Sequence, residues 1–458
     1  MPSVSSGRQV PTEAAKKYLL HWAERESVAI AACMGKYHSV LIVPVLGESA
    51  ELLDGFRTAA SRASGHVLVI LVVNSSDNAP AQTREKNQRL LSLMAARGSR
   101  LVAGPYLIRE PEFDALVIDC ASDGRELPSK QGVGLARKIG GDVGLALFAQ
   151  RRLEVPVLYF TDADVELPSD YFRRDFINVD DRVSAWLFPF RHVAGDKDDT
   201  NRATELYELS IRYHVLGLAH AASPYAYHSI GSTIAVDMNA YAAVRGVPKR
   251  NAGEDFYLLD KLGKVGPLCR LRGLPIRIKS RESERVPFGT GPQVAKIRGA
   301  GEVYVANPAA YGVLRLVIAA LDRFAQVGDA SDFEHLFDAL PAPLVLAAQG
   351  ALSDCGLLKA VIDARTMTSQ GNLRRRLHGW FDALRTLRFL HALRQAGVPD
   401  LSWQAAIQSA SFVSIVGALD CKSVLARLVE LESQLPACVG ASTGSPSLRI
   451  LHGDETSQ

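Results

Sequence analysis

The first third of the chain alternates short, continuous apolar runs with stretches whose apolar residues recur at helical spacing. The runs VLIVPV at 40–45 and VLVILVV at 67–73 are each followed by a helical pattern, at 51–63 and 81–97. A continuous apolar run bounded by turn residues is typical of a strand buried on both faces of a parallel sheet. Two strand and helix units in succession therefore predict an α/β domain.

Two more strands are expected further along. Residues 115–119 predict the third and 155–164 the fourth, and the segment SKQGVGLARKIGGDVGLALFAQ at 129–150 indicates a glycine-punctuated loop that enters a helix. Two shorter strand-like pieces and a helix follow at 184–192, 228–244 and 250–266.

From about residue 307 the pattern is helical throughout. Apolar residues recur at helical spacing, with Gly or Pro between the segments, over 311–327, 343–364, 372–397 and 422–435. We therefore predict four divisions: a polar lead-in with a short helix at 1–35, an α/β domain at 36–300, an all-helical domain at 301–440, and a disordered tail rich in Ser, Thr and Gly at 441–458.

Composition narrows the class of protein without naming a partner. The 458 residues are 47% hydrophobic and 22% charged with a net charge of +3, as in ordinary globular proteins of two or three compact units. So mild a charge requires no nucleic-acid partner, and no apolar run is long enough for a signal peptide or a membrane span. The six cysteines form no Cys-x-x-Cys pair, so we expect no zinc site, no disulfide framework, and a reducing, cytoplasmic location.

Polar side chains gather where the predicted strands end. In open α/β sheets ligands collect at the carboxyl ends of the strands, and the residues there are Glu48, Asn74, Asp77, Asp162 and Asp164. The two aspartates at the fourth strand are two residues apart and project to the same side, where like charges need compensation. Paired carboxylates suit a hard cation such as Mg²⁺ or Mn²⁺. Taken in isolation, such a pair is more often a turn and helix-capping feature.

Five segments, taken in order and spacing, resemble the GT-A-type nucleotide-sugar glycosyltransferases, most nearly the large group related to family 2. They are VLIVPVLGES, VVNSSDN, GVGLARKIGGD, FTDAD and AGEDFYLLDKLGKVG. The resemblance covers 39–291 and stops before the helical domain. It implies a Rossmann-like, mostly parallel sheet and the transfer of a sugar from a nucleoside-diphosphate donor with a divalent metal.

The resemblance also implies donor-binding roles. The loop from Pro44 to Glu48 would pack around the nucleotide. Asn74 and Asp77, which stand where the family usually has an aspartate pair, would contact the base or ribose. Arg137 would lie near the base and diphosphate, where its fork can meet phosphate oxygens in pairs. As an isolated feature it is equally typical of an exposed arginine in a first helical turn.

Metal-binding and catalytic roles follow in the same way. Asp162 and Asp164 match the metal and ribose motif, with Asp164 as the direct ligand. Asp255, preceded by Glu254, matches the general base of the inverting members, which removes the proton of the acceptor hydroxyl. Without the resemblance, these two acids are typical of a helix amino terminus, where negative charge favours the macrodipole.

Two further segments match regions near the reacting groups. The acceptor loop of the family corresponds to His228, Gly231, Ser232 and Thr233, although a lone histidine is more often structural. Arg281 and Arg285 precede a glycine-rich turn and are expected to close over the diphosphate.

The leading interpretation is thus a metal-dependent, inverting glycosyltransferase. The added helical domain is also similar to the organisation of the mannosylglycerate synthase group, which retains configuration and uses a small acid such as glycerate; in that case Asp255 need not be a base. A catalytically inactive scaffold that acts as a binding module is a further alternative. A nucleotidyltransferase is disfavoured because LGESAELL lacks a basic, glycine-rich loop.

A cluster of arginines marks one predicted helical region beside Trp380 and Phe381. Its members are Arg374, Arg375, Arg376, Arg385, Arg388 and Arg394. The main interpretation is a solvated helix face. The alternative is peripheral contact with anionic lipid or a phosphorylated acceptor.

Overall fold

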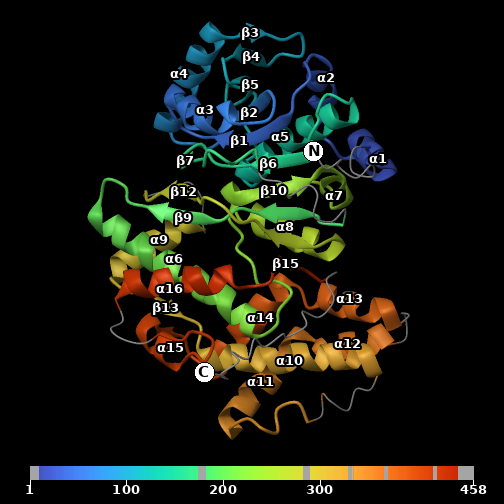
Figure 1. Ribbon diagram of the computed structural model, residues 1–458, viewed down its shortest axis with the longest axis vertical. Helices are drawn as coiled ribbons and strands as arrows, with labels where there is room; N and C mark the ends of the chain where they lie inside the picture. Colours follow the sequence, from blue (N-terminus) through green and yellow to red (C-terminus); the bar gives the residue numbers. More distant parts are fainter. Residues whose placement is uncertain are drawn as a thin grey trace, which may run out of the picture.

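A computed structural model describes residues 10–173, 182–281, 289–328, 333, 335–365, 370–415 and 420–441. Figure 1 shows a sheet with its covering helices in the upper part of the molecule and a layer of helices below it. The predicted fold class, a mostly parallel α/β sheet followed by carboxyl-terminal helices, is confirmed. Apart from residue 441, the predicted tail lies outside the described residues.

A ten-stranded sheet forms the centre of the upper part, in the order β15-β11-β8-β10-β6-β1-β2-β5-β4-β3. The four predicted strands are its parallel middle: β6 (Val157–Phe160), β1 (Ser39–Val45), β2 (Val67–Asn74) and β5 (Phe113–Cys120). Every residue of β1 and β2 is buried, as expected for parallel strands that are covered on both faces.

Short strands extend this sheet on both sides, and two small sheets accompany it. The extending strands are β3 (Ser99–Arg100), β4 (Tyr106–Arg109), β8 (Ala185–Leu187), β10 (Ile234–Asp237), β11 (Leu268–Arg270) and β15 (Cys438–Val439). The small sheets contain β7 (Val165–Glu166), β12 (Ile276–Lys279) and β9 (Phe190–Val193), and β13 (Tyr304–Val305) with β14 (Leu401–Ser402).

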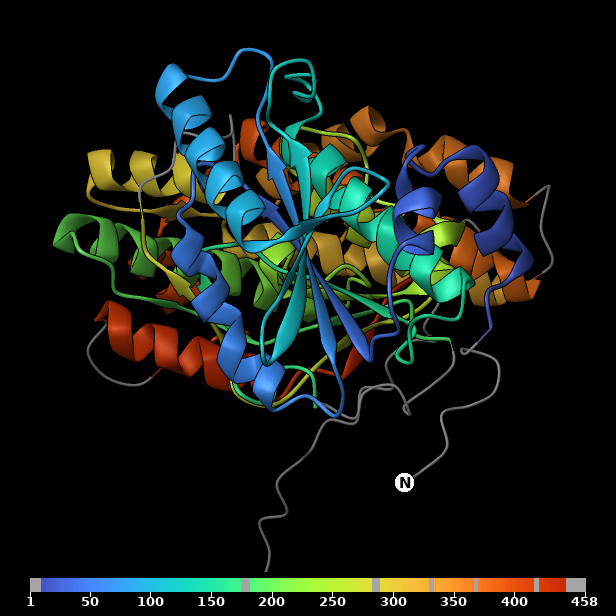
Figure 2. The same cartoon turned by 90° about the horizontal axis from the view of Figure 1, so that it is seen from above.

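Helices cover both faces because successive side chains of a strand point to opposite sides. In β1, Val40 and Ile42 belong to one apolar core, and Leu41 and Val43 belong to the other. The first core is closed by α1 (Glu13–His21), α2 (Ser27–Ala32), α5 (Gly132–Ala149), α7 (Met238–Ala243) and α8 (Glu254–Val265). The second is closed by η1 (Ala50–Leu53), α3 (Asp54–Ser61) and α4 (Ala81–Arg97). Figure 2 shows the strands lying between α5 on one side and α3 and α4 on the other.

The glycines of α5 set how closely this helix approaches the sheet. A Cβ at Gly140 would lie 2.5 Å from Cγ2 of Ile42, and one at Gly144 would lie 2.5 Å from Cδ2 of Leu158. The helix already begins at Gly132, which corrects the expectation of a glycine-punctuated loop over much of 129–150. The glycines therefore serve close packing of helix on sheet.

The lower layer is built from the predicted carboxyl-terminal helices. They are α10 (Pro308–Val327), α11 (Ala342–Cys355), α12 (Leu357–Arg365), α13 (Gln370–Trp380), α14 (Ala383–Gln395), α15 (Trp403–Ser409) and α16 (Cys421–Ser433). Two predicted stretches contain a break: Gly356, at a φ of 67°, ends α11, and Asp382 caps α14 by accepting the N–H of Arg385 at 3.0 Å. None of the described helices combines the length and the apolar run that crossing a membrane requires.

Several of the clustered arginines have partners within the protein. Nε of Arg374 lies 2.8 Å from Oδ1 of Asp322, and Nη1 of Arg394 lies 3.1 Å from Oδ2 of Asp400. The guanidinium of Arg385 lies 4.4 Å from the centre of the Trp380 ring. Contact of this region with a membrane or a phosphorylated acceptor stays a prediction.

A 23-residue helix that the sequence pattern did not predict, α6 (Asp198–His220), also belongs to the lower layer. It packs against α9 (Thr290–Ala300) and α16, and Figure 1 shows it beside α16. At the other end of the chain, β15 joins the edge of the main sheet. The division between 36–300 and 301–440 stays a prediction. Helix α6, from before residue 301, packs in the helical layer, and β15, from after it, pairs with the main sheet.

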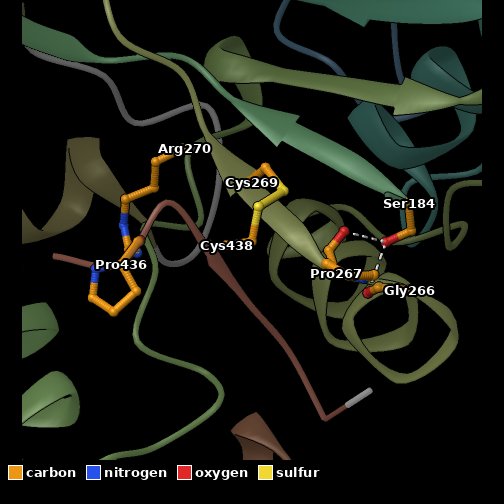
Figure 3. The surroundings of a disulfide bond; sticks show 7 residues. All are labelled: Ser184, Gly266, Pro267, Cys269, Arg270, Pro436 and Cys438. Atoms are coloured by element: carbon orange, nitrogen blue, oxygen red, sulfur yellow. Dashed lines mark hydrogen bonds between the residues drawn. A yellow bond between two sulfur atoms is a disulfide. The ribbon is translucent and has the colours of Figure 1, made fainter. Parts of the chain in front are cut away.

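A disulfide links β11 to β15, as Figure 3 shows. Cys269 and Cys438 lie opposite each other in this antiparallel pair, and the N–H of Arg270 donates to the carbonyl of Ala437 at 2.7 Å. The pair corrects the expectation that the cysteines form no disulfide. Because disulfides persist in oxidising surroundings, the cysteine pattern no longer supports a reducing, cytoplasmic location.

Removing this disulfide is expected to lower the free energy of unfolding by about 2–5 kcal/mol. The linked residues are 169 positions apart, so the bond restricts a long loop of the unfolded chain. Urea unfolding of Cys269→Ser/Cys438→Ser, with and without reductant, measures the loss. Cys33→Ser, which removes an exposed free cysteine, is the control. Equal stability of the double variant and the unreduced wild type would contradict the expectation.

Candidate active site

The candidate site lies at the point where the strand order of the parallel sheet reverses. From β1 the chain passes to β2 and β5 on one side, and β6 then pairs with the other side of β1. The carboxyl ends of two strands that flank such a switch point are where open α/β sheets bind ligands. Glu48 follows β1, and Asp162 and Asp164 follow β6.

Pro44 helps to separate these two strand ends. The carbonyl of Ile42 accepts the N–H of Thr161 at 3.1 Å, and this bond is the last between the two strands. Residues two apart present their polar groups to the same neighbour, so the nitrogen of Pro44 also faces β6 but has no N–H to donate. Pro44 is buried inside β1, which corrects the expectation that it belongs to a nucleotide-binding loop.

Arg281 joins the carboxylates of the two strand ends. Its Nε lies 2.6 Å from Oδ2 of Asp164, and its Nη1 lies 3.1 Å from Oε1 of Glu48. The small sheet brings it there, because β12 ends just before Arg281 and pairs with β7, which begins just after Asp164. Arg285, predicted to act with Arg281, lies outside the described residues.

Arg137 is buried beneath these groups and links Asp162 to α8. Its Nη2 donates to Oδ1 of Asp162 at 2.5 Å, its Nε donates to Oε1 of Glu254 at 3.0 Å, and its Nη1 donates to the carbonyl of Gly231 at 3.1 Å. The side chain is 6% exposed. The fork of Arg137 lies on protein oxygens, which corrects the alternative of an exposed arginine in a first helical turn. Donor binding by Arg137 stays a prediction.

Asp255 stands at the amino end of α8, next to Glu254. Burial, and then the neighbouring Glu254 carboxylate, raise the pKa of Asp255 to about 7, although the N–H of Phe256 donates to Oδ1 at 2.7 Å and Arg137 opposes the shift. A carboxyl group with this pKa both accepts and releases a proton near neutral pH, as a general base requires.

The cluster carries more negative charge than its arginines neutralise. The five carboxylates of Glu48, Asp162, Asp164, Glu254 and Asp255 stand against the two guanidinium groups of Arg137 and Arg281. Burial raises the pKa of Asp164, Arg281 opposes this, and Asp162 and Glu48 raise it further. Carboxylate oxygens are the ligands that Mg²⁺ and Mn²⁺ prefer. Within the described ranges, however, no three His, Cys, Asp or Glu side chains are already arranged to hold a metal ion.

Comparison with known proteins adds little beyond this geometry. No protein-family model matches the sequence, and no curated protein matches it. The structure is similar to that of a mannosyltransferase from Pyrobaculum calidifontis in complex with GDP-Man and Mn²⁺. The identity is 16%, the match covers 83% of this chain and 91% of the other, and the TM-score is 0.33. A similarity this low carries no argument, so any functional conclusion rests on the site itself.

Among the described residues, Asn74 and Asp77 at the end of β2 form no hydrogen bond to the carboxylate cluster. The amide of Asn74, 5% exposed, donates to the carbonyl of Val45 at 3.0 Å. Asn87 of α4 connects the loop after β1 to the end of β2. It accepts the N–H of Gly47 at 2.8 Å and donates to the carbonyl of Asn74 at 2.8 Å. Asp77 is exposed. Donor binding by Asn74 and Asp77 stays a prediction, and nothing in the sequence pattern pointed to Asn87.

The predicted acceptor loop is mostly internal. The segment η2 (Gly231–Thr233) is buried, and Ser232 and Thr233 are each 1% exposed. Thr161 donates to the carbonyl of Ser232 at 3.2 Å, and a Cβ at Gly231 would lie 2.6 Å from Nη2 of Arg137. Acceptor binding by Gly231, Ser232 and Thr233 stays a prediction.

His228 connects the predicted acceptor loop to α16 of the helical layer. Its Nε2 lies 2.7 Å from Oε1 of Glu432 in α16, and its ring packs edge-on against Phe190. A role of His228 in acceptor binding stays a prediction.

Proposed function

We propose that this protein transfers a sugar from a nucleoside-diphosphate donor to an acceptor hydroxyl, with Mg²⁺ or Mn²⁺ bound at the carboxyl end of β6. The observation that carries the proposal is the excess of carboxylates over guanidinium groups among the described residues at the switch point of the sheet. A divalent cation there would supply positive charge to the departing diphosphate.

Arg281 has two roles in this proposal. Without donor it pairs with Asp164 and Glu48, which we propose as oxygen ligands of the cation together with Asp162. With a cation held by these carboxylates, Arg281 would be able to donate to diphosphate oxygens, which its planar fork suits. The side chain of Asp162 is positioned by the hydrogen bond that Arg137 donates to it.

The transfer itself requires one base. The acceptor oxygen forms a bond to the anomeric carbon while the bond from that carbon to the diphosphate oxygen breaks, and the diphosphate leaves with the electron pair. Asp255 takes the proton of the acceptor hydroxyl. Attack on the face opposite the leaving group inverts the configuration, and charge stabilisation of the diphosphate is the main catalytic contribution.

Asp164→Ala is expected to weaken donor binding in Mn²⁺ by at least about tenfold and to abolish the difference between titrations with and without metal. Calorimetry with UDP- and GDP-sugars measures both effects. Glu166→Ala is the matched control, because this residue is two positions away and forms an exposed ion pair with Arg277.

Arg281 supplies a variant with the opposite expected effect in the same titrations. Arg281→Ala should bind Mn²⁺ alone more tightly than the wild type, since it removes a cation that competes for the carboxylates of Asp164 and Glu48, whereas Arg277→Ala should not. If the affinity for the donor is the same with and without metal, and the same in Asp164→Ala as in the wild type, the metal has no place in the proposal. Metal-dependent binding with no transfer to any acceptor would favour an inactive scaffold.

A further inference from the structure

A separate cavity lies where the sheet half meets the helical layer. It has a volume of about 200 Å³ and is enclosed by α6, α8, residues 225–229 and the first turns of α14. A cavity of about 150 Å³ holds a benzene ring, so this one accommodates a six-membered ring with a short substituent. Leu387, which lines it and is 39% exposed, marks the side that reaches the surface.

Most of the cavity wall is apolar. Ile211, Val215 and Leu218 project from one face of α6, and Ala383 and Leu387 project from α14. Tyr225, Tyr227 and Phe256 add aromatic surface. Walls of this kind, with a small number of placed polar groups, are characteristic of small-molecule sites.

Two hydroxyl groups of the wall are buried without a partner. Tyr227 is 6% exposed and Thr386 is 1% exposed, and within the described part of the chain neither hydroxyl makes a hydrogen bond. By contrast, the hydroxyl of Tyr225 donates to the carbonyl of His378 at 2.8 Å. Leaving a buried hydroxyl unsatisfied costs free energy, and a ligand hydroxyl would remove that cost.

The cavity offers no net charge to a ligand. Burial lowers the pKa of His214 to about 4, so this lining residue is neutral at pH 7, and its Nδ1 lies 2.8 Å from the hydroxyl of Tyr311. Burial raises the pKa of Tyr227 well above its usual value, so the phenol stays protonated. His228 is engaged by Glu432. An uncharged ligand is therefore favoured over an acid.

The described residues that line the cavity include none of the five clustered carboxylates and neither of the two clustered arginines. The two regions are neighbours, because Phe256 lines the cavity and its N–H donates to Oδ1 of Asp255 at 2.7 Å.

We propose that this cavity binds a small, uncharged alcohol or phenol, whose apolar body fills the space between α6 and α14 and whose hydroxyl pairs with Tyr227 and Thr386. This proposal does not rest on the proposed transferase activity.

Benzyl alcohol, toluene and benzoate are suitable probes, with binding measured by calorimetry and by the shift in melting temperature of the full chain. Benzyl alcohol is expected to bind roughly threefold to tenfold more tightly than toluene, which lacks the hydroxyl. Benzoate should not bind. Thr386→Val and Tyr227→Phe should each reduce the preference for benzyl alcohol over toluene. Tyr225→Phe, whose hydroxyl is already bonded, should leave the preference unchanged.

Leu218→Phe, which fills the cavity, should abolish binding of both aromatic probes. Thr386→Val keeps the shape of the side chain, so it tests the proposal even where the larger residue fails to fold. The proposal is overturned if neither aromatic probe binds the wild type, or if the preference for the alcohol survives both hydroxyl substitutions.

Discussion

Replacing Arg137 with methionine is expected to lower the free energy of unfolding by about 3–5 kcal/mol. The guanidinium and its partner Glu254 are each 6% exposed, and Arg137 also holds Asp162. Methionine occupies similar space but leaves a buried carboxylate without its cation. The loss therefore comes mainly from the Glu254 carboxylate that stays buried without a cation. Replacing both members of a buried ion pair often changes stability very little.

The double variant Arg137→Met/Glu254→Gln separates these two causes. It removes the stranded carboxylate, so it should recover part of the stability that the single variant loses. Arg277→Met is the control, since its pair with Glu166 is 58% and 66% exposed and should contribute less than about 1 kcal/mol. Urea unfolding at one pH measures all three variants. A double variant no more stable than the single one would show that stranded charge is not the cause.

Arg137 also illustrates what the sequence could establish about the site. The ends of strands can be recognised where apolar runs stop, and this placed Asp162 and Asp164 at the carboxyl end of a strand, where the structure has them. The role of Arg137 could not be recognised in this way. Its partners lie 25 and 117 residues away along the chain, so the choice between protein carboxylates and a ligand phosphate is decided by tertiary packing.

The elements that were missed share a similar physical cause. In α6, Thr200, Thr204, Glu208 and Arg212 are buried at intervals of four residues, and these polar residues hide the apolar period of the helix. Their polar groups find partners both within α6 and in other elements: Arg212 donates to Glu208 at 2.8 Å, and Thr204 donates to the carbonyl of Thr200 at 2.8 Å. Glu208 accepts the N–H of His192 at 2.8 Å, for example. The disulfide likewise depends on residues 169 positions apart, which spacing rules for nearby cysteines do not detect.

Asp255→Asn is expected to lower kcat by about 10²- to 10⁴-fold, the usual contribution of a general base. Since Asp255 must be ionised to accept a proton, and its pKa is about 7, the wild-type rate should rise with pH up to about 7 and then level off. In Asp255→Asn this rise should disappear. Initial rates across pH 5 to 9, with assignment of the product anomer, measure both properties.

The same substitution is expected to stabilise the protein at high pH. An aspartate in the unfolded chain has a pKa of about 3.9, so the folded state binds this proton more tightly, and the free energy of unfolding falls as pH rises from about 4 to about 7. Above that window the full cost of burying the ionised group is present. Asparagine never ionises, so Asp255→Asn should gain roughly 2–4 kcal/mol at pH 8 and almost nothing at pH 4.

Asp260→Asn provides the contrasting variant on the same helix. Burial raises the pKa of Asp260 as well, although the N–H of Ala383 at 3.0 Å and Lys264 at 2.7 Å oppose the shift. Asp260→Asn should therefore also gain stability as pH rises, while kcat changes little. A base at Asp255 thus predicts an inactive variant beside an active one, with both variants stabilised at high pH. Retention of configuration, or full activity of Asp255→Asn, would exclude Asp255 as the base. A stability gain at pH 8 would even then confirm the buried charge, because that gain depends on burial and not on catalysis.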